Sequence, residues 1–317
     1  MLTYNELKEK ARDFLAATSL TVEEFQLLLP FFIAAYRKIY PSAQTLAGAL
    51  RQRQAGGGAK GRLESFEDRL LFILVYQKTH PLQTMHGLQF GMSQSSANHW
   101  IHHLLPVLQQ ALADSGHQPE RDGSKLAAHP LATEVAPNLV IDGTERRRER
   151  PQDHQVQKEH YSGKRRAHTD KNIILVNENT TKVAYLGPTT PGKTHDKKMA
   201  DNENIRYPDK ATLDKDSGFQ AYEPENTINT QTKKKPKGKE LSLGDKLFNQ
   251  AFASLRIVVE HAISGVKRCR IVKDVLRLTK AGISDLVMEI ACGLHNLRVS
   301  CRKQIETVDL LSFLSAA

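Results

Sequence analysis

The chain has 317 residues, with 45 Lys and Arg against 35 Asp and Glu, so its formal net charge is +10. This length is sufficient for two domains. The positive charge favours a polyanionic partner, most simply nucleic acid, although a merely basic protein would share this composition. Three cysteines without a CxxC pair argue against a disulfide scaffold or a zinc site and fit a reducing cytosol. No apolar run approaches the roughly 18 residues of a membrane span.

Helical patterns fill the first part of the chain. The stretch from Tyr4 to Ala17 has its apolar residues on one stripe and is predicted to form a single helix. Thr21 and Glu24 have the spacing of a capping box, which predicts a second helix that starts there and stops before Pro41. Pro30 lies inside this second helix and is expected to kink or divide it.

A flexible linker is predicted at Gln54 to Gly61, QAGGGAKG, and we expect it to be mobile. After it, the pattern is helical again from Leu63 until Pro81 ends it. Two short helical pieces are then expected around Gly91, which can turn the chain, and Ser93, which can cap the second of them.

The order of helix, glycine turn and capped helix is typical of a helix-turn-helix, whose second helix enters the major groove of DNA. We place this motif at about residues 63–112. The side of the second helix that is expected to be buried carries Ala97, Trp100, Ile101 and Leu104. The polar side chains, which suit base edges and phosphates, are Gln94, Ser95, Asn98, His99 and His102. Periodicity alone is equally compatible with an ordinary helical hairpin.

A polar stretch, Asp114 to Ala136, is expected to separate the helical N-terminal region, residues 1–131, from the rest of the chain. Beyond it, short β-type runs predict four strands, at Asn138–Ile141, Asn172–Val176, Val183–Leu186 and Ala211–Asp216. A helix is expected within Pro191 to Asn202, and helices return from Leu247 onwards. This order of elements predicts an α/β domain over residues 132–317.

Four acidic residues occupy informative places on these elements. Asp142 is expected at the end of the first strand, where Gly143 lets the backbone turn, and Asp216 at the end of the fourth. Asp196 stands at a helix start, and Glu260 lies in a later helix. Taken alone, an acid after a strand is more often a turn or capping residue than a catalyst.

Acids on strand ends can lie side by side in a folded sheet. Clustered carboxylates repel one another, and each would stay partly protonated without a cation between them. Ligand sets made only of Asp and Glu oxygens suit Mg²⁺ or Mn²⁺ rather than zinc. Two such ions, about 4 Å apart, can activate a water and stabilise a leaving 3′ oxygen.

The helix that carries Glu260 also carries two basic residues on the same side. Arg256 and Lys267 are predicted to lie within roughly 40° of Glu260 around the helix axis. The opposite, apolar side is expected to contain Phe252, Leu255, Val259 and Ile263. The alternative interpretation is a solvated stripe with an ion pair between residues four apart.

Six segments occur in a specific order: IDGTE, EHYSGK, PGKTHDKKMAD, DSGFQAY, KKKPKGKEL and RIVVEHAISGVKRCRI. With the helical segment around Ser93, they resemble bacterial insertion-sequence transposases of the DDE superfamily, in the group related to the eukaryotic Harbinger elements. The resemblance covers about Leu63 to Val299. It implies a ribonuclease-H-like catalytic domain preceded by an all-α helix-turn-helix domain. It also implies Mg²⁺-dependent cutting and joining of DNA, with two ions in the site.

The resemblance also assigns roles to the acids. The catalytic triad of the family falls on Asp142, Asp216 and Glu260, and Asp196, in the His-Asp motif, is a further metal ligand. The second carboxylate has an alternative in Asp214, which alternation in a strand would point to the same face as Asp216. We prefer Asp216, because it touches the Ser-Gly turn and matches the family position.

Related transposases carry a Tyr-Arg-Glu-Lys helix signature, in which Ala253 here stands in place of the tyrosine. The residues that we expect to contact DNA are Ser95, Asn98, His99, Arg146, Arg147, Arg148, Lys164, Arg165, Lys233, Lys234, Lys235, Arg256, Lys267 and Arg268.

The sequence is therefore interpreted as a DNA transposase that hydrolyses a phosphodiester bond at the ends of its element and transfers the 3′-OH into target DNA. One alternative is a nuclease that cleaves but no longer joins, and another is a repressor-like DNA-binding protein with an inactive catalytic domain. We expect a homodimer on double-stranded DNA, at terminal inverted repeats and at the target, in the bacterial cytoplasm at the nucleoid, without a membrane partner.

Overall fold

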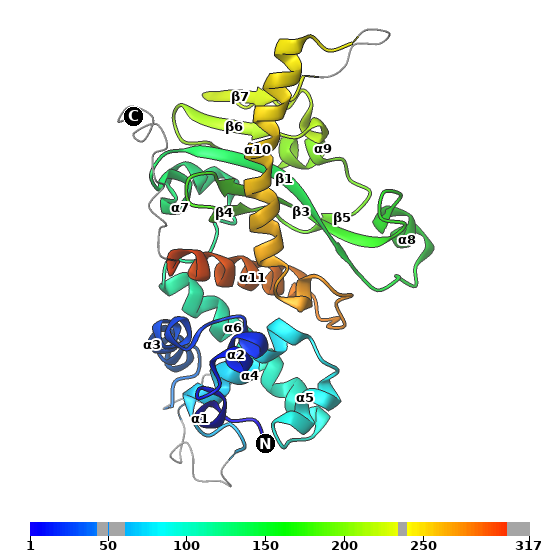
Figure 1. Cartoon of the computed structure of the whole chain (residues 1–317). Helices are drawn as coiled ribbons and strands as arrows, with labels where there is room; N and C mark the ends of the chain where they lie inside the picture. Colours follow the sequence, from blue (N-terminus) through cyan, green and yellow to red (C-terminus); the bar gives the residue numbers. More distant parts are fainter. Residues whose placement is uncertain (43–49, 51–60, 234–239, 303–317) are drawn as a thin grey trace, which may run out of the picture.

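A computed structural model describes residues 1–42, 50, 61–233 and 240–302 of the chain (Figure 1). Residues 54–60 of the predicted linker, and Lys234 and Lys235, lie outside this described part. The α-helices are α1 (Tyr4–Leu7), α2 (Ala11–Thr18), α3 (Val22–Ile39), α4 (Phe66–Thr79), α5 (Gln83–Gln89), α6 (Gln94–Asp114), α7 (Pro130–Thr133), α8 (His154–His160), α9 (Asp196–Glu203), α10 (Leu243–Val266) and α11 (Ile283–Ser300). The strands are β1 (Asn138–Arg147), β2 (Tyr161–Ser162), β3 (Ala167–Asn177), β4 (Val183–Leu186), β5 (Thr190–Pro191), β6 (Ala211–Lys215) and β7 (Thr227–Gln231). The short 3-10 helices are η1 (Gly123–Ala128), η2 (Ser217–Phe219) and η3 (Arg270–Val272).

The first three helices differ in two places from the sequence prediction. The predicted single helix from Tyr4 to Ala17 is wrong, because the chain leaves the helical conformation before α2, where Lys10 has φ −114° and ψ 75°. Instead, α1 is held on α4, since Tyr4 N donates to Asp68 Oδ1 at 2.8 Å. The capping box at the start of α3 is confirmed, but Pro30 does not divide this helix. Among the described residues, no single helix is long and apolar enough to cross a membrane, and α2 and α3 reach that length only as a pair bent by 53°.

Helices α5 and α6 form the predicted helix-turn-helix. Gly91 has φ 66° in the turn, and the side chain of Ser93 caps α6 by accepting from a backbone N–H of its first turn. The turn folds back so closely on α5 that a Cβ on Gly87 would lie 2.7 Å from Met92 O, a contact that only glycine avoids. Trp100 is only half buried, whereas the rest of the predicted apolar side of α6 is buried.

The strands form a seven-stranded sheet in the order β2-β3-β1-β6-β7, with β4 and β5 also paired to β3. β3 runs antiparallel to β1, β2, β4 and β5, whereas β6 is parallel to both β1 and β7. All four predicted strands are present, as β1, β3, β4 and β6. The two-residue strands β2 and β5 and the strand β7 are additional, and the polar run of β7 gives no clear signal in the sequence. β1 continues to Arg147 instead of ending at Ile141, because its pairing with β3 extends that far.

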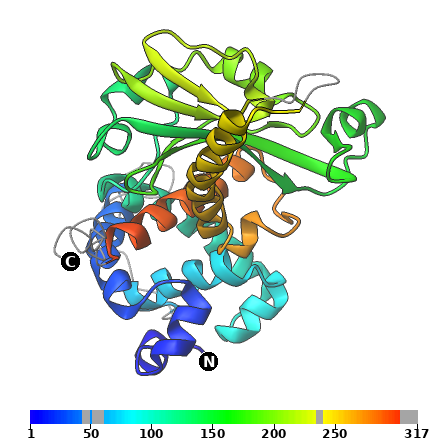
Figure 2. The ribbon, with the colours of Figure 1, turned by 45° about the horizontal axis from the view of Figure 1, so that its top comes forward.

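Two apolar clusters cover the two faces of this sheet. One face carries Val140 and Ile174 and packs on α10 and α11, and its cluster continues into α2, α3, α4 and α6. The other face carries Leu139 and Ile141 and packs on α7 and α9. Figures 1 and 2 show α10 crossing the first face, from β7 towards α11. The N-terminal helices and the sheet therefore share one continuous core.

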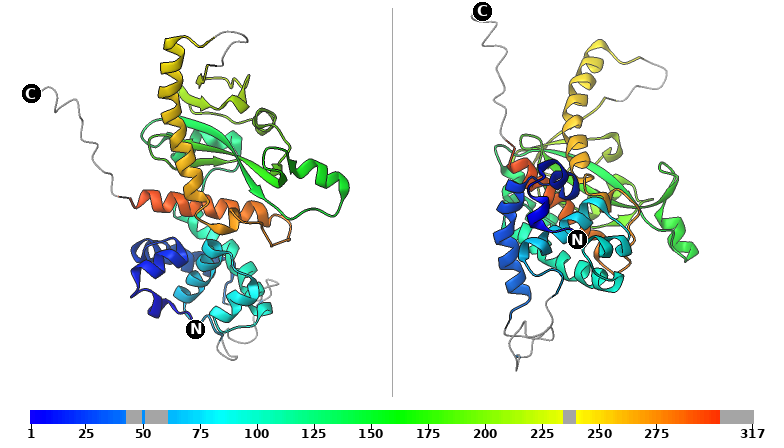
Figure 3. Two further views of the ribbon diagram at one scale, coloured as in Figure 1. Left: turned by 45° about the vertical axis from the view of Figure 1, so that its right-hand side comes forward. Right: turned by 60° about the horizontal axis from the view of Figure 1, so that its bottom comes forward.

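Helix α11 joins the helical region to the sheet and lies between them in Figure 3. The fully buried side chain of Asn296 accepts from Val183 N at 2.7 Å and donates to Val183 O and to His117 O, both at 2.9 Å. Arg298, also buried, donates to Gly265 O at 2.7 Å. These bonds satisfy backbone groups of β4 and α10 that are buried away from water.

We expect Asn296→Ala to lower the free energy of unfolding by about 3 kcal/mol, because the N–H and C=O of Val183 lose a buried partner. Urea denaturation of the full chain measures this change. Asn202→Ala, on the exposed side of α9, is the matched control and should change the free energy by less than about 0.5 kcal/mol. Similar losses in the two variants would contradict the role given to Asn296.

Candidate active site

The pairing of β1 with β6 brings two of the predicted acids together. The strands are parallel, and Ile141 lies beside Lys215, the last residue of β6. Asp142 and Asp216 are the residues that directly follow this last pair, one on each segment. Neighbouring strands lie roughly 4.8 Å apart, so these half-buried acids are neighbours where β6 ends.

Asp142 does not end its own strand, as the sequence predicts, but lies where the neighbouring strand ends. β1 continues to Arg147 while β6 stops at Lys215, so that no described strand pairs with β1 on this side beyond Ile141. The predicted turn at Gly143 is also wrong, because Gly143 lies within the strand and its N–H donates to Asp142 Oδ1 at 2.7 Å. Asp142 therefore lies at an open edge of β1 instead of at a strand end.

Asp196, the first residue of α9, packs against the segments of both acids. A Cβ on Gly143 would lie 2.5 Å from Asp196 Oδ1, and a Cβ on Gly218 would lie 2.8 Å from Asp196 Oδ2. Glycine at both positions lets the carboxylate come this close to β1 and to the turn after Asp216. Asp196 Oδ1 is buried, and Lys171 Nζ lies 3.1 Å from it without the alignment of a hydrogen bond.

Sequence reasoning missed Glu145 and Lys171, which accompany Asp196. They are cross-strand partners on β1 and β3. Lys171 Nζ lies 3.7 Å from Glu145 Oε1 and donates to Thr194 O at 3.1 Å. Lys171 is only 8% exposed, so its charge is balanced by the two carboxylates more than by water. A signal was present in IDGTE, since alternation puts Glu145 on the same face as Gly143.

The sequence predicts that Glu260 joins these acids, but the structure does not bring it to them. It is exposed on α10, whose apolar side packs on the sheet. After α10, Lys267 turns inward and donates to Glu145 O at 3.2 Å, so Glu260 and Lys267 do not form one exposed ridge. Burial and the nearby Arg165 lower the pKa of Lys267, whereas Asp142 raises it. Among the described residues, no three His, Cys, Asp or Glu side chains lie close enough to share one ion.

Asp214, the alternative second carboxylate, lies inside the sheet. It is paired with Val140 on one side and with Thr230 on the other, and it is 5% exposed. Burial, and then the charge of Glu178, raise its pKa to about 6. Its position between β1 and β7 keeps Asp214 from the open edge that Asp216 reaches.

Two of the arginines predicted to contact DNA are engaged within the protein. Arg146 is buried and donates to Ser284 O at 2.9 Å and to Asn172 Oδ1 at 2.7 Å, so its assignment to DNA is wrong. The reason is its place on β1, where alternation turns it towards α11. Arg148 is half buried and forms an ion pair with Asp170 at 3.0 Å, so it is not a free cation on the surface.

Other predicted contacts lie on the surface. The exposed basic candidates are Arg147, Lys164, Arg165, Lys233 and Arg268. On α6, Ser95 and His99 are exposed, while Asn98 is half buried and donates to Gln83 Oε1 at 3.1 Å. The side chain of Arg256 lies outside the part of the chain that the structure describes.

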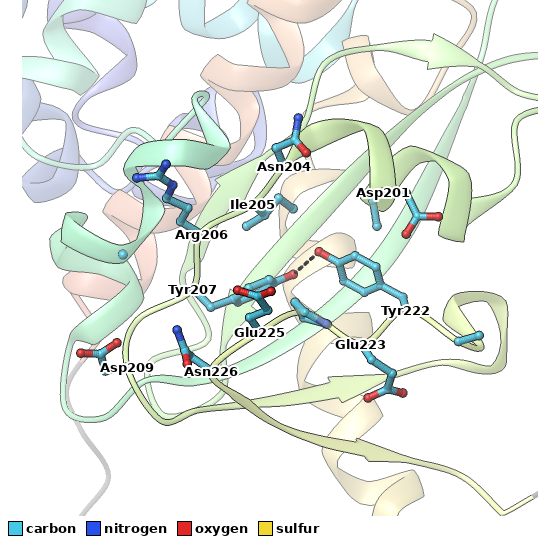
Figure 4. A pocket seen from close by; sticks show the side chains of 14 residues that line it. Asp201, Asn204, Ile205, Arg206, Tyr207, Asp209, Tyr222, Glu223, Glu225 and Asn226 are labelled. Atoms are coloured by element: carbon cyan, nitrogen blue, oxygen red, sulfur yellow. Dashed lines mark hydrogen bonds between the residues drawn. The ribbon is translucent and has the colours of Figure 1, made fainter.

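A pocket of 990 Å³ lies near the starts of β6 and β7, away from the paired acids (Figure 4). The hydroxyl groups of Tyr207 and Tyr222 are hydrogen-bonded across it at 3.2 Å. Four acids line it against a single arginine: Asp201, Asp209, Glu223 and Glu225 against Arg206. Such a lining repels phosphates, so this pocket does not suit the backbone of a nucleic acid.

The close approach of Asp196 to β1 predicts a coupling between two substitutions. Gly143→Ala should lower the free energy of unfolding by about 2 kcal/mol, because the new methyl group meets the carboxylate. Adding Asp196→Ala should restore most of this loss, since it removes the colliding atoms. Urea unfolding of the single and double variants measures the coupling, and Gly163→Ala, with nothing within 4 Å of its Cβ, is the control. Strictly additive effects would contradict this packing.

Comparison with known proteins gives matches over both the helix-turn-helix and the sheet. The family model described as DDE superfamily endonuclease matches residues 141–296, and the model described as helix-turn-helix of DDE superfamily endonuclease matches residues 61–114. The chain is 28% identical over 237 residues to the "Probable transposase for insertion sequence element IS702" of Microchaete diplosiphon, across 74% of this chain and 82% of that protein. No solved structure matches. The two family models fall on the helix-turn-helix and on the sheet with its three candidate aspartates, and the chain therefore belongs to the DDE superfamily of insertion-sequence transposases.

Proposed function

We propose that this transposase hydrolyses phosphodiester bonds at the ends of its element and then transfers the 3′-OH to target DNA. The observation that carries the proposal is the β1–β6 register, whose last pair, Ile141 and Lys215, directly precedes Asp142 and Asp216. This register supports a meeting of the two acids at the open edge of β1. Asp196 packs against both segments from α9. The order of antiparallel β4, β3 and β1 followed by parallel β6 and β7 supports a ribonuclease-H-like catalytic fold.

The acids at this edge are of the ligand type that binds divalent cations, although in this arrangement no three of the described side chains surround one ion. Asp142, Asp196 and Asp216 offer oxygen ligands alone, which suit Mg²⁺ or Mn²⁺, and Asp196 Oδ1 is a buried oxygen without a hydrogen-bond donor. Glu260, on the helix that packs over the face of Asp142, is the fourth acid that would hold two ions. When bound, the ions supply an activated water and stabilise the leaving 3′ oxygen. Lys171 balances the charge of Asp196 and Glu145 and holds both beside the edge.

The proposed substrate is double-stranded DNA, first at the terminal inverted repeats and then at the target. Helix α6 would present Ser95, Asn98 and His99 to base edges. The exposed cations would hold phosphates without reading sequence: Arg147, Lys164, Arg165, Lys233 and Arg268.

Assembly and organisation follow from this substrate. A homodimer would bring two element ends together, in the bacterial cytoplasm at the nucleoid. We propose the division into residues 1–131 and 132–317 as a division of function, DNA reading and chemistry, because the core on one sheet face is common to both parts.

A cleavage-only nuclease or a repressor-like binder is the second candidate. It is favoured by the exposed position of Glu260, which belongs to no group of three possible metal ligands among the described side chains. A pure binder, however, gains nothing from carboxylates that face DNA phosphates, since like charges repel. The paired aspartates therefore favour the transposase.

The catalytic assignment is tested by charge-removing substitutions of similar shape. Asp142→Asn, Asp216→Asn and Glu260→Gln should each reduce Mg²⁺-dependent cleavage by roughly a thousandfold or more, because the charge that holds the ions is lost. Asp214→Asn is the matched control, and it should retain most of the activity because Asp214 is buried between strands. Cleavage of one labelled duplex carrying an element end, with binding measured in parallel, gives the comparison.

Two results would overturn parts of this assignment. An inactive Asp214→Asn variant together with an active Asp216→Asn variant would move the second carboxylate to Asp214. Unchanged cleavage by all four variants would exclude the proposed mechanism.

DNA reading is tested on α6. Replacing Asn98 and His99 with alanine should weaken binding to a terminal-repeat duplex at least about tenfold more than binding to a random duplex, since contacts to base edges are lost. Replacing Arg147 and Arg165 should weaken both alike and reduce the salt slope by about one for each residue. Fluorescence anisotropy over a salt series measures these effects. If the two double variants lose affinity equally on both duplexes, α6 is not the reading helix.

A further inference from the structure

A cavity of 520 Å³ lies on the hairpin that contains α8 and β2, which projects from the sheet in Figure 1. It is lined mainly by basic and aromatic residues, among them Arg150, His154, Lys158, Tyr161, His168 and Lys193. Its volume falls within the range of sites that enclose a small organic group. This lining carries positive charge, whereas the lining of the pocket near β7 is mainly acidic.

Tyr161 provides an open aromatic wall in this cavity. It is the cross-strand partner of His168 in the pairing of β2 with β3. The two rings are 5.7 Å apart at 69°, an edge-to-face contact. Tyr161 is nevertheless 46% exposed. A ring that is fixed at one side and open at the other can stack a flat, electron-rich partner such as a nucleobase.

Hydrogen bonds fix the Arg150 side chain and the backbone of Lys193 beside the ring. Arg150 donates from Nε and Nη2 to Gln157 Oε1, at 3.1 and 2.9 Å. The N–H of Lys193 donates to Glu159 O at 3.2 Å, which ties this loop to α8. Gly192 allows the approach, because a Cβ there would overlap Thr169 Oγ1. The cavity is therefore formed by the fold itself.

The cavity is connected to the acids by two short segments. Lys193 stands three residues before Asp196, and the Lys171 side chain that pairs with Asp196 also holds Thr194 O. Along β3, His168 is three residues from Lys171 and six from Ile174, the partner of Asp142, which corresponds to about 10 Å and about 20 Å. One DNA strand advances by about 3.4 Å per nucleotide. A strand whose phosphate lies at the acids would therefore reach the cavity within about three to six nucleotides.

We propose that this cavity holds an unpaired nucleotide of the DNA strand that is processed, with its base stacked on Tyr161 and its phosphates held by Arg150, Lys158 and Lys193. The inference rests on the proposed function and adds to it a binding site outside the acids and the reading helix. Stacking tolerates any base, so the site takes a nucleotide by its unpaired state and not by its identity. The energy needed to unstack a base is least for one that is already unpaired.

The test uses the full chain and two single-stranded probes, in buffer with EDTA so that no cleavage contributes. The first probe is a 12-nucleotide oligodeoxythymidine with one central 2-aminopurine, whose fluorescence is quenched when the base stacks. The second is an abasic 12-mer with the same phosphates. Tyr161→Leu should weaken binding of the first probe about tenfold and abolish the quenching, but leave binding of the abasic probe unchanged. Tyr161→Phe should behave as the unaltered protein does.

Phe31→Leu, at an exposed aromatic residue of α3, is the matched control and should change neither probe. If Tyr161→Leu lost affinity equally for both probes, the cavity would take phosphates only, and the proposal would be overturned. Unchanged affinity and quenching in Tyr161→Leu would overturn it as well. Retained binding of the abasic probe by Tyr161→Leu excludes misfolding as the cause of a loss, and retained affinity in Tyr161→Phe shows that the ring and not the hydroxyl group is needed. Since no cleavage is measured, failure of the catalytic variants described above leaves this result unaffected.

Discussion

The parallel pairing of β1 with β6 is the constraint on which the site depends. Parallel strands cannot be joined by a tight hairpin, so the chain has to cross over before β6 can lie beside β1. Helix α9 belongs to that crossover, which is why Asp196 at its first residue reaches the same edge as Asp142 and Asp216. One topological requirement thus places three acids that are far apart in the sequence, and the difference in length between β1 and β6 leaves their edge open.

The alternation of side chains along a strand decides which charged residues are buried in the protein and which face solvent. Along β1, Arg146 turns towards α11 and meets the oxygens of Ser284 and Asn172, whereas its neighbour Arg147 faces solvent. Burial lowers the pKa of Arg146, and a buried guanidinium is stable only where acceptors surround it. The arginine run that the sequence suggests as one phosphate-binding strip is therefore divided by the pleat of the strand.

The sequence predicts those elements that local signals determine. The turn at Gly91, the cap at Ser93 and the β-branched runs act within a few residues, and the structure confirms the elements that they predict. The polar strand β7 has no such signal in its composition. It forms a strand because its backbone pairs with β6. The same limit applies to the site. Asp142 and Asp216 could be selected from residue patterns, but the exclusion of Asp214 and the roles of Glu145 and Lys171 depend on register, which is set by contacts between distant segments.

Charge is distributed unevenly along the sheet, and this distribution has a consequence for the way in which DNA approaches. Arg147 lies at the end of β1, and Arg165 and the cations of the α8 hairpin follow beyond it. The acidic pocket, in contrast, lies by the starts of β6 and β7. The acids at the open edge stand between these two regions. A duplex is attracted towards the first and repelled from the second, so that the field alone favours one direction of approach. Because the net charge of +10 supplies attraction at long range, the local arrangement needs only to orient DNA that has already been captured. An orientation that brings phosphates to the carboxylate edge also brings the same strand past Tyr161, and the two features of the sheet are therefore parts of one path.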